Sequence, residues 1–125
     1  MWELVSRAEL WRTWTAFPST GLEREGEPAP DGVGAIRRFG VGSMGSREEV
    51  VVFEPPTHLG YVLLSGLPVH GYRSDVTLTP TPTGGTDIEW MSSFDARAAD
   101  GWFWAGFLKV LLTDFTRRLA KAAAR

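Results

Sequence analysis

Residues 101–125, GWFWAGFLKVLLTDFTRRLAKAAAR, have the spacing of one long amphipathic helix. Large apolar side chains recur there every three or four positions, which places them on one face: Trp104, Phe107, Leu108, Leu111, Phe115, Leu119 and Ala122. The end of the segment is basic, and positive charge complements the C-terminal end of a helix dipole. Its first half, 101–112, is apolar on nearly every side. We therefore expect this half of the helix to bury more of its surface than packing against one face of a sheet would require.

Glycine and proline divide the chain before this helix. Of the 14 Gly and 8 Pro residues, all but Gly101 and Gly106 lie between Pro18 and Gly85. Because these residues interrupt helices and favour turns, we expect helices at the two ends of the chain and strands between them. We expect about six strands in this region. The turn-rich segments that separate them are residues 28–32, 40–45, 55–57, 66–68 and 80–85.

The first residues predict two short helices. Trp2, Val5, Trp11 and Trp14 recur at helical spacing with one wider gap, and Ser6 is placed to cap the second helix. In the middle segment, period-two alternation assigns faces to the strands. One face carries Tyr72, Ser74, Val76 and Leu78, continued on the next strand by Ile88, Trp90, Ser92 and Phe94. This face needs an apolar cover, and the helix at 101–125 is the only large candidate, so the fold class is α+β.

Particular segments of the chain carry a resemblance to a known family. They are Trp2–Ser6 with Trp11 and Trp14, Gly32–Ala35 with Arg37, Glu49–Pro56, Leu59 with Tyr61, Gly66–Pro68 with Tyr72, and Gly85-Thr86 leading to Trp90 and Phe94. In this order the chain resembles the helix-grip fold of the START-like or SRPBCC superfamily, in its polyketide cyclase/dehydrase branch. The resemblance covers residues 1–125 as a single domain and implies a long helix packed across a curved antiparallel sheet.

One departure from the family concerns the edge of the sheet. Members of the family normally begin with a strand that pairs with the last one, here about Thr86 to Phe94, whereas this chain starts inside the first helix. We therefore expect unpaired ladder groups along that edge. One hypothesis is that an internal GTG codon has been read as the start, since the family often has Val at the position of Met1. The other is that a second chain fills the edge, as in a homodimer.

Composition excludes several functional classes. Thirteen Lys and Arg against 15 Asp and Glu give a net charge of -2, which disfavours nucleic-acid binding. Cysteine is absent, which excludes disulfides, thiolate metal sites and thiol nucleophiles. No secretory signal or membrane-spanning segment is present, so we expect a cytoplasmic protein. The segment 40–45 matches G-x-G-x-x-G, but a Val-rich strand follows it instead of a helix, so we interpret it as a hairpin and expect no cofactor. His58 and His70 are too far from each other and from a matching carboxylate pair to suggest a metal site, so we expect no metal.

Two alternatives exist for the polar residues of the predicted inner face. Alternation places Arg37 with Ala35 and Phe39, and Glu49 with Val51 and Phe53. An Arg37–Glu49 ion pair between neighbouring strands is one interpretation. The other is that Arg37 binds a carboxylate or enolate oxygen, with Tyr72 as hydrogen-bond donor.

The two histidines have different expected roles. His58 follows a Pro-Pro turn, where a structural role is expected. His70 precedes Tyr72 in a region that borders the cavity mouth in the helix-grip fold, and its imidazole suits a general acid or base. His70, Tyr72 and Arg37 are therefore the candidate catalytic residues.

The resemblance implies a cavity between the sheet and the last helix that binds a hydrophobic or aromatic small molecule, polyketide-like or lipid-like. The candidate ligand-binding residues are Glu49, Tyr61, Ser74, Trp90, Ser92, Phe94, Trp104, Phe107, Leu108 and Leu111. Catalysis there would resemble that of a cyclase, aromatase or dehydrase. The alternative is a non-catalytic interaction module, chaperone-associated or toxin–antitoxin-like, that uses the open edge or the apolar start of the last helix.

Overall fold

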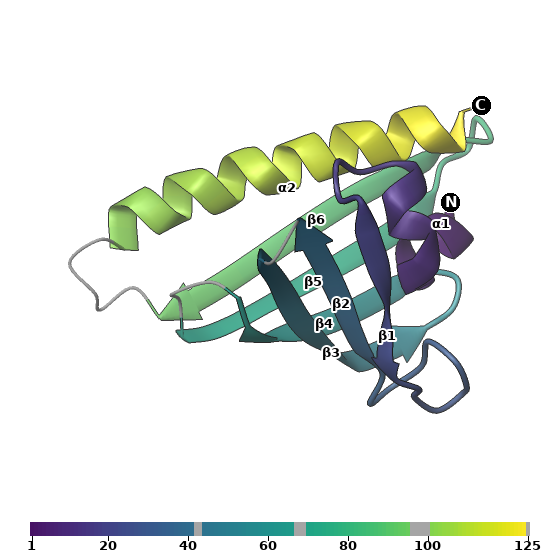
Figure 1. The fold of residues 1–125 in the computed structure, drawn as a ribbon. Helices are drawn as coiled ribbons and strands as arrows, with labels where there is room; N and C mark the ends of the chain where they lie inside the picture. Colours follow the sequence, from purple (N-terminus) through teal and green to yellow (C-terminus); the bar gives the residue numbers. More distant parts are fainter. Residues whose placement is uncertain (42–43, 67–69, 96–100, 125) are drawn as a thin grey trace.

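The computed structural model describes residues 1–41, 44–66, 70–95 and 101–124, and it leaves out the side chains at 41, 44, 70 and 101–104. Two short helices come first, then six strands and one long helix (Figure 1). The elements are α1 (Trp2–Ser6), the 3-10 helix η1 (Ala8–Thr13), β1 (Ser19–Arg24), β2 (Ile36–Val41), β3 (Met44–Glu54), β4 (His58–Ser65), β5 (His70–Pro80), β6 (Thr86–Asp95) and α2 (Gly101–Ala123). The order and number of the elements confirm the prediction.

The six strands form one sheet in chain order, and every neighbouring pair is antiparallel. Val41 pairs with Met44, so the glycine-rich segment 40–45 connects two strands of a hairpin. The described residues on both sides of positions 42–43 belong to strands, β2 before and β3 after, so the motif does not lead into the helix that a dinucleotide site requires. Among the described residues, β1 and β6 are the two edges of the sheet, and β6 is paired on the β5 side alone.

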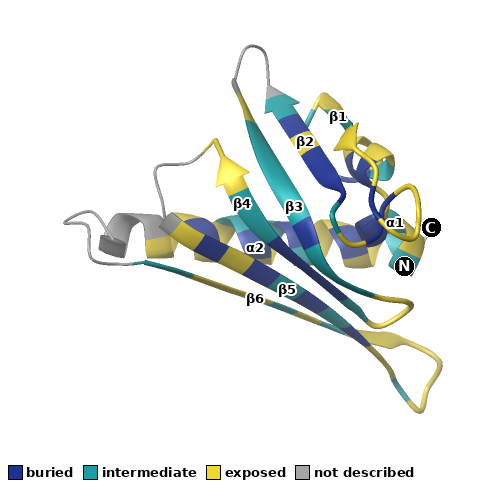
Figure 2. Cartoon of the chain, turned by 90° about the horizontal axis from the view of Figure 1, so that it is seen from below, coloured by how far each residue is buried: buried dark blue, intermediate teal, exposed yellow. Residues whose placement is uncertain are grey.

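The layers are a curved sheet and a helix laid across its inner face. Figure 1 shows α2 extending over the sheet along β6, with α1 at the end of the molecule where both termini lie. Along β5 buried and exposed residues alternate (Figure 2), and Tyr72, Ser74, Val76 and Leu78 are the buried ones. The alternation is weaker on β6, where Trp90 is half-buried and Ser92 is exposed. The predicted α+β helix-grip fold is confirmed.

A distant residue caps the second helical turn. Ser6 is buried but makes no capping hydrogen bond, so the prediction of a Ser6 cap was wrong. Instead, the Ala8 backbone N–H donates to Asp31 Oδ1 at 3.1 Å. A carboxylate acceptor at a helix N-terminus satisfies a free N–H group and matches the helix dipole. Asp31 thus ties the loop after β1 to the N-terminal helices.

Candidate functional site

A cavity of about 260 Å³ lies between the inner face of the sheet and α2. Five of the ligand-binding and catalytic candidates line it: Tyr61, Tyr72, Phe107, Leu108 and Leu111. Phe115, from the apolar stripe of the last helix, lines it as well. Sequence reasoning missed a further set of lining residues, namely Trp11, Phe17, Phe39, Glu48 and Leu63. Most of these side chains are aromatic or aliphatic, which is the usual lining of a small-molecule site.

The remaining candidates lie elsewhere. Trp90, Ser92 and Phe94 line a second hollow, of about 340 Å³, between β6 and α2, and Leu108 borders both hollows. Ser74 is fully buried between the strands, where its hydroxyl donates to the Met91 carbonyl at 3.1 Å. The side chains of His70 and Trp104 lie outside the described residues.

Glu48, a residue of the cavity wall, forms an ion pair with Arg37, which lies behind it. Arg37 is fully buried, and its Nη2 donates to Glu48 Oε1 at 3.0 Å. Its Nη1 donates to the Val5 carbonyl at 3.3 Å, and its Nε has no partner among the described residues. The guanidinium carbon lies 4.9 Å from the Trp11 ring centre and 4.6 Å from that of Tyr61, within the range of cation–π attraction.

The partner of Arg37 corrects the predicted ion pair. Arg37 lies opposite Glu48 in the β2–β3 ladder, whereas Glu49 lies on the other face of β3 and is 3.9 Å from Arg24. A register shift between Val50 and Val52 breaks the alternation of β3. Because one extra residue reverses every later side chain, Phe53 packs against the core although Glu49 does not face the cavity. The prediction of an Arg37–Glu49 pair was therefore wrong.

Tyr61, Tyr72 and Ser46 are the other described residues with polar side chains that line the cavity. Burial, joined by the nearby Glu48 carboxylate, raises the pKa of Tyr72 to about 12. Burial likewise raises the pKa of Tyr61 well above its usual value. The Tyr61 hydroxyl accepts a hydrogen bond from Trp90 Nε1 at 3.2 Å, and the same N–H is 2.9 Å from Ser74 Oγ. Both phenols therefore remain neutral hydrogen-bonding groups across the physiological pH range.

Burial also acts on the Glu48 carboxyl. It raises the pKa of Glu48, while the charge and hydrogen bond of Arg37 act in the opposite direction. The arginine thus supports a negative charge at the cavity wall, where an isolated carboxylate would be costly.

An absorbance titration tests the burial of the tyrosines, which are the two in the chain. We expect no phenolate absorbance near pH 10, where a free tyrosine ionises, and the first step near pH 12, from Tyr72. The folded-state pKa lies above the unfolded value, so the stabilising contribution of Tyr72 is complete below pH 10. It is lost as the pH rises to about 12. A phenolate step near pH 10 with the circular dichroism of the fold intact would contradict this assignment.

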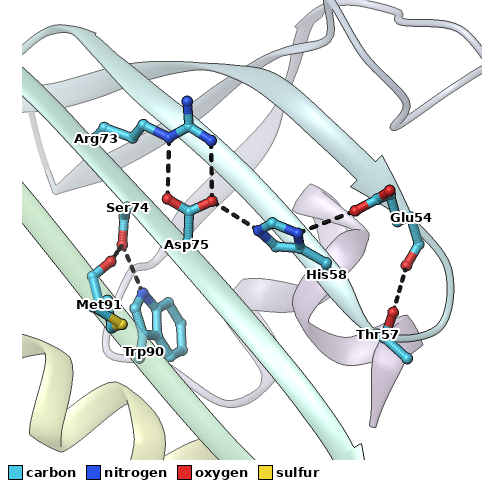
Figure 3. A network of polar contacts seen from close by, with 8 residues as sticks. All are labelled: Glu54, Thr57, His58, Arg73, Ser74, Asp75, Trp90 and Met91. Carbon is cyan, nitrogen blue, oxygen red and sulfur yellow. Dashed lines mark hydrogen bonds and ion pairs between the residues drawn. The ribbon is translucent and has the colours of Figure 1, made fainter.

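A separate polar network lies on the outer face of the sheet (Figure 3). His58 Nε2 is 2.8 Å from Asp75 Oδ1, and its Nδ1 is 3.1 Å from Glu54 Oε1. Arg73 Nε donates to the second oxygen of Asp75 at 3.0 Å, and this hydrogen bond is the main reason that the pKa of Asp75 is lowered. His58, at the start of β4, thus joins the end of β3 to the middle of β5, and it lies apart from the residues that line the cavity.

The described residues contain neither a cluster suited to a metal ion nor a helix suited to crossing a membrane. No group of three or more His, Asp or Glu side chains is placed to hold a metal ion in the part of the chain that the structure describes. Within the same residues, no helix combines the length and hydropathy needed to cross a bilayer.

Comparisons with known proteins give a family and a fold. The family model described as "Polyketide cyclase / dehydrase and lipid transport" matches residues 1–124. No match was found among curated proteins. Among solved structures, the chain is similar to the solution structure of protein BH1534 from Bacillus halodurans, with 20% sequence identity and a TM-score of 0.53. The alignment covers 78% of this chain and 62% of that chain, so the present chain spans less than two-thirds of its length.

Proposed function

Since the chain belongs to the polyketide cyclase / dehydrase and lipid transport family, we propose that it binds a hydrophobic small molecule in the cavity between the sheet and α2. The observation that carries this proposal is the lining of that cavity. Most side chains that line this space of about 260 Å³ are aromatic or aliphatic, and Glu48, Ser46 and the two tyrosines supply its polar groups. An apolar cavity with a few convergent polar groups is the usual form of a small-molecule site.

The same cavity supports a finer proposal, cyclase- or dehydrase-type chemistry. Tyr72 is the hydrogen-bond donor that we assign to a substrate carbonyl oxygen, because its hydroxyl stays protonated and its side chain lines the cavity. Arg37 does not line the cavity, and it acts through Glu48 as a positioning residue. His70, at the start of β5, remains the proposed acid or base.

Filling the cavity tests the binding site. Leu111 is half-buried and lines the cavity, whereas its neighbour Val110 is 71% exposed. We expect Leu111→Trp to weaken binding of the fluorescent probe 1-N-phenylnaphthylamine by about tenfold or more, because the larger side chain occupies the ligand volume. Fluorescence titration measures the change, and Val110→Trp is the matched control, with unchanged affinity.

Two outcomes would count against the proposed function. One is equal binding by both variants, which would place the probe outside the cavity. The other is that neither the probe nor any copurifying small molecule, sought by native mass spectrometry, binds the wild-type chain. In the second case, a stable dimer in light scattering would favour the interaction module.

A further inference from the structure

One oxygen of the Glu48 carboxylate, Oε2, is available to accept a hydrogen bond from a ligand. Its Oε1 accepts from Arg37, and no hydrogen bond to Oε2 exists among the described residues. The side chain is 13% exposed and lines the cavity. A carboxylate has room for about four hydrogen bonds, so Glu48 can accept more than the one from Arg37. The cavity wall thus carries a charged acceptor with room for a donor from a ligand.

The charges around Glu48 exclude an anionic ligand. The positive charge of Arg37 is neutralised by Glu48 itself and enclosed by the rings of Trp11, Phe39 and Tyr61. None of the described residues that line the cavity is Lys or Arg. A carboxylate group of a ligand would therefore meet the Glu48 carboxylate at short range with no cation to balance it, which is unfavourable at low dielectric.

We propose that the cavity selects an apolar ring compound that donates a hydrogen bond from a neutral hydroxyl, a phenol or an alcohol, to Glu48 Oε2. This inference rests on the proposed function and names the ligand class for the same site. The cavity volume of about 260 Å³ favours a small ligand, because it lies just below the range of roughly 300–1,000 Å³ of small-molecule pockets. A compact ring system fits such a space better than a long acyl chain.

Three matched probes test the hydroxyl preference at pH 7: 2-naphthol, 2-naphthoate and 2-methylnaphthalene, each titrated as a competitor of 1-N-phenylnaphthylamine. We expect 2-naphthol to bind about tenfold more tightly than 2-methylnaphthalene, the effect of one hydrogen bond to a charged acceptor. We expect 2-naphthoate to bind more weakly than both. If 2-methylnaphthalene binds and 2-naphthol gains nothing over it, or if 2-naphthoate binds as tightly as 2-naphthol, the hydroxyl preference is wrong while the proposed function stands. If none of the probes binds, the proposed function itself fails.

Two neighbouring glutamates provide a matched pair of variants. Glu48→Gln leaves the charge of Arg37 uncompensated beside the cavity, so we expect the ratio of 2-naphthol to 2-naphthoate affinity to fall by about tenfold or more. Glu49→Gln makes the same chemical change one residue away, on the other face of β3, and should leave the ratio unchanged. A Glu48→Gln protein that folds and keeps the wild-type ratio would overturn the inference.

A further variant serves if Glu48→Gln does not fold, which thermal melting by circular dichroism would reveal. Glu48→Asp keeps the negative charge and withdraws the carboxylate by one methylene group. We then expect weaker 2-naphthol binding with 2-naphthoate still excluded. Unchanged 2-naphthol affinity in this variant would contradict contact with Glu48.

Discussion

Replacing Arg37 with methionine is expected to lower the free energy of unfolding by about 3–5 kcal/mol. The substitution leaves the Glu48 carboxylate in a largely buried site without its cation. It also removes the cation–π contacts with three rings and the hydrogen bond to the Val5 carbonyl. Since a typical domain has a total stability of only about 5–15 kcal/mol, a loss of this size is a large share of the total. Urea denaturation followed by far-ultraviolet circular dichroism measures it.

The double variant Arg37→Met/Glu48→Gln distinguishes the charge effect from lost packing. Removing the carboxylate charge removes the uncompensated buried ion, so the double variant should be more stable than Arg37→Met alone. Simple addition of the two single losses would mean that the pair has no energetic coupling and that Arg37 contributes through packing alone. That result would also weaken the assignment of Glu48 as a charged acceptor at the cavity wall.

Replacing Trp11 with alanine is expected to cost a similar amount, about 3–5 kcal/mol. Trp11 is 2% exposed, and its indole N–H donates to the Val5 carbonyl at 2.8 Å. Its ring lies 4.7 Å from that of Trp14, 4.8 Å from Phe39 and 5.4 Å from Phe115, so it joins η1, β2 and α2. Alanine would leave a cavity among these rings, and cavity formation adds to the lost transfer free energy.

The matched control for Trp11→Ala is Trp2→Ala. Trp2 is half-buried and makes an edge contact with Phe53 at 5.4 Å, so its removal exposes less apolar surface and leaves no enclosed void. We expect roughly half the loss of stability in the same urea experiment. Equal losses for the two variants would mean that the centre of the aromatic cluster does not lie at Trp11.

The fold was predictable because its determinants are local. The positions of glycine and proline separate the strands, and the three- to four-residue spacing after Gly101 marks α2. Each of these patterns depends on neighbours in the chain, and each survives in the structure.

The identity of the charged cavity residue was not predictable from alternation alone. The bulge at Val51 makes Glu49 and Phe53 appear to share a face, although they do not. The hairpin offered a better signal. With Val41 opposite Met44, counting outward along both strands brings Arg37 opposite Glu48. The dipeptide Gly42-Ser43 is typical in sequence of two-residue hairpins, so the register could have been derived from it.

Other parts of the site depend on contacts between distant segments. Trp11 and Phe17 reach the cavity from the N-terminal segment. The Asp31 cap of η1 likewise joins residues 23 positions apart. No periodic pattern within one element encodes such contacts, because tertiary packing determines them.

The strictly sequential order of the strands also has a consequence for how the chain is assembled during synthesis. Each strand pairs with the one made just before it, so the sheet can grow hairpin by hairpin with short loops to close. The cover is made last, because α2 follows all six strands. Until it emerges from the ribosome, the aromatic inner face that includes Phe39 and Tyr72 has no helix over it. In this period the nascent chain exposes the surface that later becomes the cavity wall, and it is then most open to aggregation or to capture by a chaperone.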